Sequence, residues 1–290
     1  MKKRSIMGLG ILLPILIVSN SCSKNDTNTP PPPAKTVQLK TSATLGNYLT
    51  DKDGRTLYYF SNDANGQNNC SGGCAAVWPI FNADNLTADL LGDGLNLTDF
   101  SSITTASGSK QVTYKGCPLY YYAPGANGTN VPEAAGQTTG EGVGGIWFVA
   151  KPDYTIMLAN AQLVGHDGKN YTSNYTAGNG KTLYFTDGNG LTLYGFITDK
   201  ANKNNFTKPD FSNNAVWPIY ETDKAVVPST LDKSLFGSID VFGKKQLTYK
   251  GWPLYYFGQD NHIRGNNKGI SFPQPGIWPV VTKDIAPATP

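Results

Sequence analysis

Short apolar and aromatic stretches bounded by turn residues recur along the chain, which is the pattern of β-strands. The segment TLYYF at residues 56–60 is one of them. A strand places Tyr58 and Phe60 on one face and Leu57 and Tyr59 on the other. Because both faces are aromatic or apolar, the strand is expected to be covered on both sides, or to present one face as a binding surface.

Turn signals separate these stretches. Asp53-Gly54 and Lys115-Gly116 each supply a glycine where a tight hairpin turn needs a positive φ. Only the segment from Ala83 to Leu95 shows a modest helical pattern beyond the N-terminal region. The fold class predicted is therefore all-β, made of short antiparallel strands and hairpins, with sandwich and small barrel units both open.

The chain contains an internal duplication. AVWPIF at residues 76–81 recurs as AVWPIY at residues 215–220, and KGCPLYYY at residues 115–122 recurs as KGWPLYYF at residues 250–257. Similar phrases in the same order indicate a tandem repeat.

The duplication predicts two homologous domains, residues 37–152 and residues 153–284. The second is lengthened by an insertion around residues 170–180. A short tail, residues 285–290, follows it.

The N-terminus is typical of a targeting segment. Three basic residues precede the apolar stretch Ile6–Val18, which is shorter than the about 20 residues that a helix needs to cross a bilayer. The stretch ends at Cys22 and resembles the cleavage site of bacterial lipoproteins. This predicts a lipoprotein signal peptide at residues 1–21, with a plain secretory signal as the alternative.

The same resemblance implies that Cys22 is lipidated and attaches the protein to a membrane. Residues 22–36 then form a linker that contains the prolines of residues 30–33 and should stay extended. Ser23, directly after the lipidated residue, implies sorting to the outer membrane of a Gram-negative cell envelope.

Composition agrees with strands and tight turns, since the chain holds 32 Gly and 19 Pro and is only 16% charged. The formal charge of +3 disappears without the signal segment, which leaves 21 basic against 21 acidic residues. A balanced charge gives no support for a nucleic-acid partner.

Candidate catalytic and metal chemistry is sparse. The only histidines, His166 and His262, occupy non-equivalent places in the two domains, and no metal-ligand spacing surrounds them. No serine or carboxylate set matches a hydrolase pattern. The protein is therefore not expected to be an enzyme, and no cofactor or metal is expected.

A Tyr-x-aromatic-x-x-Asp motif recurs along the chain, and with it the chain resembles the bacterial "secreted repeat of unknown function" lipoproteins. The complete copies are Tyr58, Phe60 and Asp63; Tyr194, Phe196 and Asp199; and Tyr255, Phe257 and Asp260. A fourth copy, Tyr120, Tyr122 and Gly125, lacks the Asp.

The resemblance extends to a Cys-x-x-x-Cys before a Trp-Pro pair, here Cys70, Cys74, Trp78 and Pro79. The second domain keeps Trp217 and Pro218 but has Phe206 and Asp210 near the cysteine positions.

Two interpretations of the motif are open. In the structural one, Tyr and the aromatic residue pack as a ladder with a neighbouring hairpin, and the Asp caps backbone N–H groups in a turn. In the other, the aromatic face binds a ligand.

The cysteines predict one disulfide. Cys70 and Cys74 lie close enough to close a short loop, and an oxidising compartment favours the bond. Cys117 is then left unpaired. It stands where the second domain has Trp252, and we interpret it as a small buried hydrophobe in a hairpin that packs differently from its relatives.

These observations favour a membrane-anchored envelope lipoprotein, a non-catalytic binding or structural module whose candidate partners are a glycan or an envelope protein. The alternative is a redox or electron-transfer accessory protein that uses the cysteines of the first domain or the tyrosines.

Overall fold

The computed structural model describes residues 34–126 and 129–290, which belong to one compact unit. The predicted signal segment, Cys22 and most of the linker lie outside the described residues. Below, residues 37–152 are called lobe 1 and residues 153–284 lobe 2.

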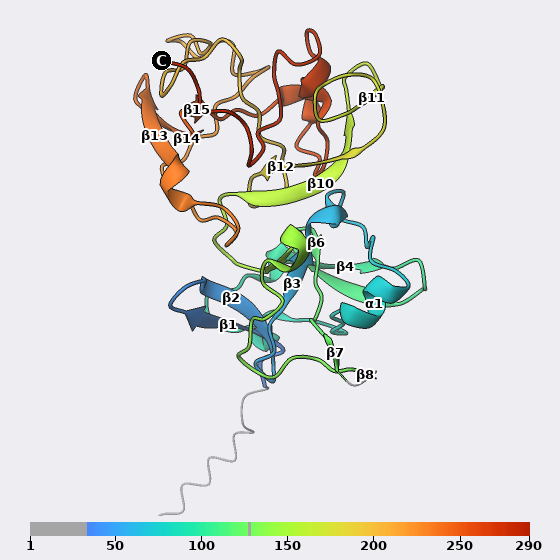
Figure 1. The fold of residues 1–290 in the computed structure, drawn as a ribbon. Coiled ribbons are helices and arrows are strands. Elements are labelled where there is room, and N and C mark those ends of the chain that lie inside the picture. Colours follow the sequence, from blue (N-terminus) through green and yellow to red (C-terminus); the bar gives the residue numbers. More distant parts are fainter. Residues whose placement is uncertain (1–33, 127–128) are drawn as a thin grey trace, which may run out of the picture. The chain divides into compact units, whose positions relative to one another are not determined.

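Both lobes are built from short antiparallel strands in sheets of two or three strands, so the fold is all-β as predicted (Figure 1). The strands of lobe 1 are β1 (Val37–Ser42), β2 (Gly46–Asp51), β3 (Tyr58–Phe60), β4 (Phe100–Thr104), β5 (Lys110–Tyr114), β6 (Cys117–Pro118), β7 (Gly125–Ala126), β8 (Thr129–Asn130) and β9 (Trp147–Val149). Those of lobe 2 are β10 (Met157–Val164), β11 (Asn170–Tyr171), β12 (Lys181–Thr186), β13 (Phe236–Val241), β14 (Lys244–Tyr249) and β15 (Trp252–Pro253).

Helical structure is limited to short turns. The α-helix is α1 (Gly73–Val77), and the 3-10 turns are η1 (Ser61–Asp63), η2 (Ala88–Leu90), η3 (Leu97–Asp99), η4 (Val143–Gly145), η5 (Lys233–Leu235), η6 (Gly258–Asp260) and η7 (Lys268–Ser271).

The same hairpins occur in both lobes. β1 pairs with β2 as β10 pairs with β12, and β4, β5 and β6 pair in the order that β13, β14 and β15 repeat. The β10–β12 connection is much longer than the β1–β2 connection and contains β11. The predicted insertion at residues 170–180 lies in this connection.

The turns between β5 and β6 and between β14 and β15 explain the two KG pairs. Lys115 and Gly116 have φ of 47° and 76°, and Lys250 and Gly251 have φ of 49° and 84°. Positive φ at both central residues matches the twist of a two-residue hairpin. Each lysine leaves its hairpin to bind a distant carbonyl: its Nζ donates to Pro152 in lobe 1 at 2.7 Å and to Lys283 in lobe 2 at 2.8 Å.

The segment TLYYF is covered on both sides, since none of its residues is more than 7% exposed. Tyr58 and Phe60 pack into an aromatic cluster inside lobe 1, whereas Tyr59 belongs to a cluster shared with lobe 2. The continuous run of apolar and aromatic residues therefore reflects burial on both faces of the strand.

The predicted helix at residues 83–95 is wrong. The segment contains only η2, and its chain then runs alongside the edge of β1. The N–H of Thr36 donates to the Leu90 carbonyl at 2.6 Å, and the N–H of Gly92 donates to the Val37 carbonyl at 2.8 Å. Pairing with an open strand edge therefore replaces the helical hydrogen bonds of this segment.

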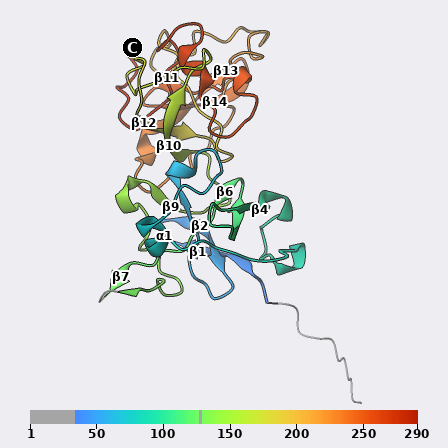
Figure 2. The same ribbon diagram turned by 90° about the vertical axis from the view of Figure 1, so that its right-hand side faces the viewer.

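The two lobes contact each other through β10, which lies against η1 in both views (Figure 2). The Asn160 amide donates to the Asn62 side-chain oxygen at 2.7 Å. Arg264 of lobe 2 donates to the Lys115 carbonyl at 2.6 Å. A shared apolar cluster lies beside these polar contacts, so each lobe buries part of the surface of the other.

Candidate functional site

The motif strands of each lobe lie next to each other. Tyr58 and Tyr120 exchange two backbone hydrogen bonds of 2.9 Å, and so do Tyr194 and Tyr255. Two motif copies therefore meet side by side inside each lobe, where all four tyrosines are fully buried.

The tyrosine hydroxyls cross between the copies. Tyr120 donates to Asp63 at 2.5 Å, so the tyrosine of the second copy binds the acid of the first. In lobe 2, Tyr255 donates to Asp199 at 2.7 Å and Tyr194 donates to Asp260 at 2.6 Å. Each copy thus supplies the carboxylate that the other copy needs.

The missing Asp of the fourth copy is replaced by Glu133. The hydroxyl of Tyr58 donates to Glu133 Oε1, and Thr139 donates to Glu133 Oε2 through its N–H at 2.9 Å. The matching contact in lobe 2 is the N–H of Lys268 donating to Asp260 at 2.9 Å. The loss of the Asp therefore does not alter the crossed bond, so this departure does not make the hairpin pack differently from its relatives.

The sequence motif does not reveal Glu133, because the residues around β7 and β8 separate it from Tyr120. Its spacing from the tyrosine is therefore far longer than in the other copies. The one available signal is that Glu133 is among only three glutamates in the chain.

The motif aspartates also act as turn caps, as predicted. Asp63 accepts the N–H of Asn69 at 2.8 Å, and Asp199 accepts the N–H of Asn205 at 2.7 Å. The second oxygen of each is the one that accepts the tyrosine hydroxyl. Both carboxylate oxygens are thus engaged in hydrogen bonds that hold the fold together.

Burial raises the pKa of Asp63, Asp199 and Asp260 to about 6, although tyrosine and backbone donors favour the charged form. Burial and the neighbouring carboxylate also raise the pKa of Tyr120 and Tyr255 above the ordinary value. The tyrosines therefore stay protonated and keep donating to the acids.

A stack of aromatic rings lies beside the crossed bonds. In lobe 1, Trp78 and Trp147 are parallel with ring centroids 3.8 Å apart, and Phe60 stacks on Trp147 at 3.9 Å. In lobe 2, Trp217 and Trp278 are also 3.8 Å apart. The Trp-Pro motif thus supplies one ring of each buried tryptophan pair.

Phe196 stacks on Trp278 of that pair at 4.2 Å. The outer ring of each stack is the aromatic residue of the other motif copy: Tyr122 lies 4.4 Å from Trp78, and Phe257 lies 4.4 Å from Trp217.

The predicted disulfide between Cys70 and Cys74 is present in lobe 1. Lobe 2 closes the same loop with a hydrogen bond instead: the Asn213 side chain donates to the Phe206 carbonyl at 2.7 Å. Asn213 stands four residues before Trp217, as Cys74 does before Trp78, so it is the counterpart of Cys74 and Asp210 is not.

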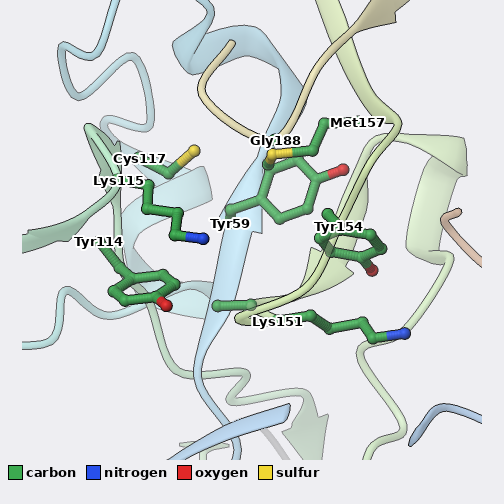
Figure 3. A pocket seen from close by; sticks show the side chains of 9 residues that line it. Tyr59, Tyr114, Lys115, Cys117, Lys151, Tyr154, Met157 and Gly188 are labelled. Atoms are coloured by element: carbon green, nitrogen blue, oxygen red, sulfur yellow. The ribbon is translucent and has the colours of Figure 1, made fainter. Parts of the chain in front are cut away.

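Cys117 is buried and unpaired where lobe 1 meets lobe 2. Together with Tyr59 and Met157 it lines a space of only about 10 Å³ (Figure 3), which leaves room for one water at most. Burial raises the pKa of the thiol, which argues against a reactive thiolate. The thiol is buried, as predicted, and the guanidinium of Arg264 lies close to it.

Trp252 fills the matching position of lobe 2 and donates from its ring N–H to the Ala286 carbonyl at 2.7 Å. The segment around Ala286 therefore covers lobe 2 at the place where Arg264 and Met157 of lobe 2 cover lobe 1. A tryptophan at position 117 would collide with lobe 2, which explains the exchange in the two octapeptides.

A hollow of about 400 Å³ lies against the aromatic stack of lobe 2. Trp217 and Trp278, which are 2% and 1% exposed, form its floor. The residues around it are Phe196, Phe206, Val216, Phe272, Pro273 and Ile277, together with Asn213.

No group of three or more metal-ligating side chains occurs among residues 34–126 and 129–290. His166 and His262 are both exposed, in different surroundings. Across the same part of the chain, none of the helices has the length and apolar character required to pass through a bilayer.

Two stretches, residues 41–82 and residues 240–282, match the family model described as a secreted repeat of unknown function. The chain carries this secreted repeat twice. The first match contains the Tyr58 motif and the second the Tyr255 motif, so each match covers one motif copy and about a third of a lobe. No curated protein and no solved structure matches the chain.

Proposed function

We propose that the protein is a lipid-anchored, non-catalytic binding or structural module of the cell envelope. The supporting observation is that the acids and tyrosines of the secreted repeats bind each other in buried crossed pairs. A carboxylate held in this way has no free oxygen with which to act on a substrate, so the motif is a structural device.

Anchoring is part of the proposal. It is supported by the apolar segment that ends at Cys22 and by the secreted nature of the family. A lipid on Cys22 would hold the compact unit near a membrane through the proline-containing linker, and the outer membrane is the expected site. The candidate partners are a glycan or an envelope protein.

The anchor is tested by growing cells with an alkyne-labelled fatty acid and comparing the protein with its Cys22→Ser variant. The expected result is a labelled protein in the outer-membrane fraction and an unlabelled variant outside it. Label on both proteins, or on neither, contradicts the anchor.

The redox alternative receives less support. Lobe 2 replaces the Cys70–Cys74 bond with the Asn213 hydrogen bond and keeps the same aromatic stack. Because the Asn213 amide closes the equivalent loop of lobe 2 without any redox chemistry, loop closure is sufficient to explain the disulfide.

A further inference from the structure

The tryptophans of the aromatic stack are buried in both lobes, but the phenylalanine at one end of the stack is buried in lobe 1 and borders a hollow in lobe 2. Phe60, at the end of the first stack, is 7% exposed and buried, whereas its counterpart Phe196 is only half-buried and lines the hollow. The rings themselves are arranged alike in the two lobes. The opening therefore comes from the segments around the stack.

Two segments border the hollow, and both are longer than their counterparts in lobe 1. Trp78 lies eight positions after Cys70, but Trp217 lies eleven positions after Phe206. Asn213 fixes this longer loop: its amide nitrogen donates to the Phe206 carbonyl, and its oxygen accepts the N–H of Lys208 at 3.1 Å.

The second bordering segment shows the same difference. Trp147 lies seven positions after Gly140, but Trp278 lies nine positions after Gly269. The added residues carry Phe272 and Pro273 to the rim of the hollow. Both lengthened segments therefore border the same hollow, and together they form its walls.

The surface next to the hollow is also more apolar than its counterpart. Ile197 is 46% exposed, whereas the matching Ser61 is 1% exposed and lies in the turn that β10 covers. The match rests on equivalent backbone bonds, from Ser61 to the Ile146 carbonyl and from Ile197 to the Ile277 carbonyl. Ile197 thus adds an exposed apolar side chain next in sequence to Phe196, which lines the hollow.

The lining decides the chemistry of the ligand. Apart from Asn213, whose amide atoms are both hydrogen-bonded within the chain, every residue around the hollow is apolar. A sugar hydroxyl or a charged group placed there would lose its water without gaining a partner. A hydrocarbon chain would lose nothing polar, and about 400 Å³ is within the range of small-molecule sites.

We infer that the hollow of lobe 2, floored by Trp217 and Trp278, binds a hydrocarbon chain such as the acyl chain of an envelope lipid. The inference rests on the proposed binding function and names the class of ligand. The rigid floor of stacked rings holds the site ready without the ligand, which reduces the ordering cost of binding.

The test uses dodecanoate as probe, below its micelle concentration, and the compact unit Pro33–Pro290. Affinity is measured by calorimetry for the parent, for Ile277→Ser at the rim, and for Ile146→Ser at the matching position of lobe 1. Both isoleucines are partly buried, so the second variant controls for general loss of stability.

The expected result is binding that Ile277→Ser weakens about tenfold, or 1.4 kcal/mol, and that Ile146→Ser leaves unchanged. A bromine on the chain end of the probe should quench tryptophan fluorescence in the parent and in Ile146→Ser, and less in Ile277→Ser. A second variant, Val216→Phe, fills the hollow from its wall and should abolish the quenching while the protein stays folded.

Absence of binding, or equal weakening by both serine variants, overturns the inference. Self-association in light scattering that Ile277→Ser alone removes would assign the hollow to a second copy of the chain and also overturn it. Neither outcome bears on the lipid on Cys22, which the labelling experiment tests separately.

Discussion

Lobes 1 and 2 have the same interior and different surfaces. The tryptophan pair is separated by 3.8 Å in both lobes, and crossed tyrosine–carboxylate bonds flank it in both. The differences are Cys117 against Trp252, a disulfide against Asn213, and a buried Phe60 against a half-buried Phe196 that borders a hollow. The duplicated chain has kept what holds a lobe together and changed the places where a lobe meets something else.

The largest expected effect comes from the shared interior. Trp78→Ala and Trp217→Ala each remove a buried ring from a stack, and each should cost about 3–5 kcal/mol of unfolding free energy. Urea unfolding followed by circular dichroism measures the loss. Equal losses support equivalent stacks, and a near-normal variant in either lobe would break the comparison.

The next effect is a pH dependence carried by the buried aspartates. The pKa of Asp63 and Asp199 is about 6 in the folded protein and 3.8 for the free side chain, so their contribution to stability is fully present below 3.8. It is lost as the pH rises through about 6. The difference in unfolding free energy between the parent and Asp199→Asn should therefore fall by about 2–3 kcal/mol from pH 4 to pH 8.

Asp63→Asn is the matched variant in lobe 1 and should show the same slope. Urea unfolding at several pH values measures both. A flat difference for either variant would mean that its aspartate is not buried as the structure has it.

A smaller effect is expected at the junction of the lobes. Cys117→Trp places an indole where Met157 and Arg264 now pack and should cost about 1–3 kcal/mol. Cys117→Ala, which keeps the position small, should cost less than about 1 kcal/mol and serves as control. If thermal unfolding shows that the tryptophan variant is as stable as the parent, the junction is not the reason for the exchange.

The smallest effect concerns the two loop closures. Replacing both Cys70 and Cys74 by serine should cost on the order of 1–2 kcal/mol, because the closed ring is short. Asn213→Ala should cost about 1 kcal/mol through the lost side-chain hydrogen bond. Thermal unfolding compares the two variants. A disulfide variant that loses several times more than Asn213→Ala would show that the closures are not equivalent.

The sequence predicts what depends on neighbouring residues. The strand at Tyr58 and Phe60, the turn at Lys115 and Gly116, and the Cys70–Cys74 bond all follow from local spacing, and the structure contains them. Each is determined by a few consecutive side chains and by backbone geometry, so no tertiary information is needed.

Contacts between distant segments could not be predicted. Tyr58 and Glu133 are brought together by the fold, and their spacing follows no motif. The helix expected at residues 83–95 failed for a similar reason, since the free edge of β1 competes for its backbone. The hollow of lobe 2 depends on where two lengthened segments meet, and this also is fixed only in three dimensions.

The crossed bonds restrict which duplications and deletions of the repeat unit give a stable protein. A single unit carrying one tyrosine and one acid would bury both without partners, because the partner of each group lies on the adjacent unit. Leaving a polar group buried and unpaired costs about 1–3 kcal/mol, and more for a charge. Duplications and deletions of these units should therefore survive in even numbers, and the heritable module is the pair.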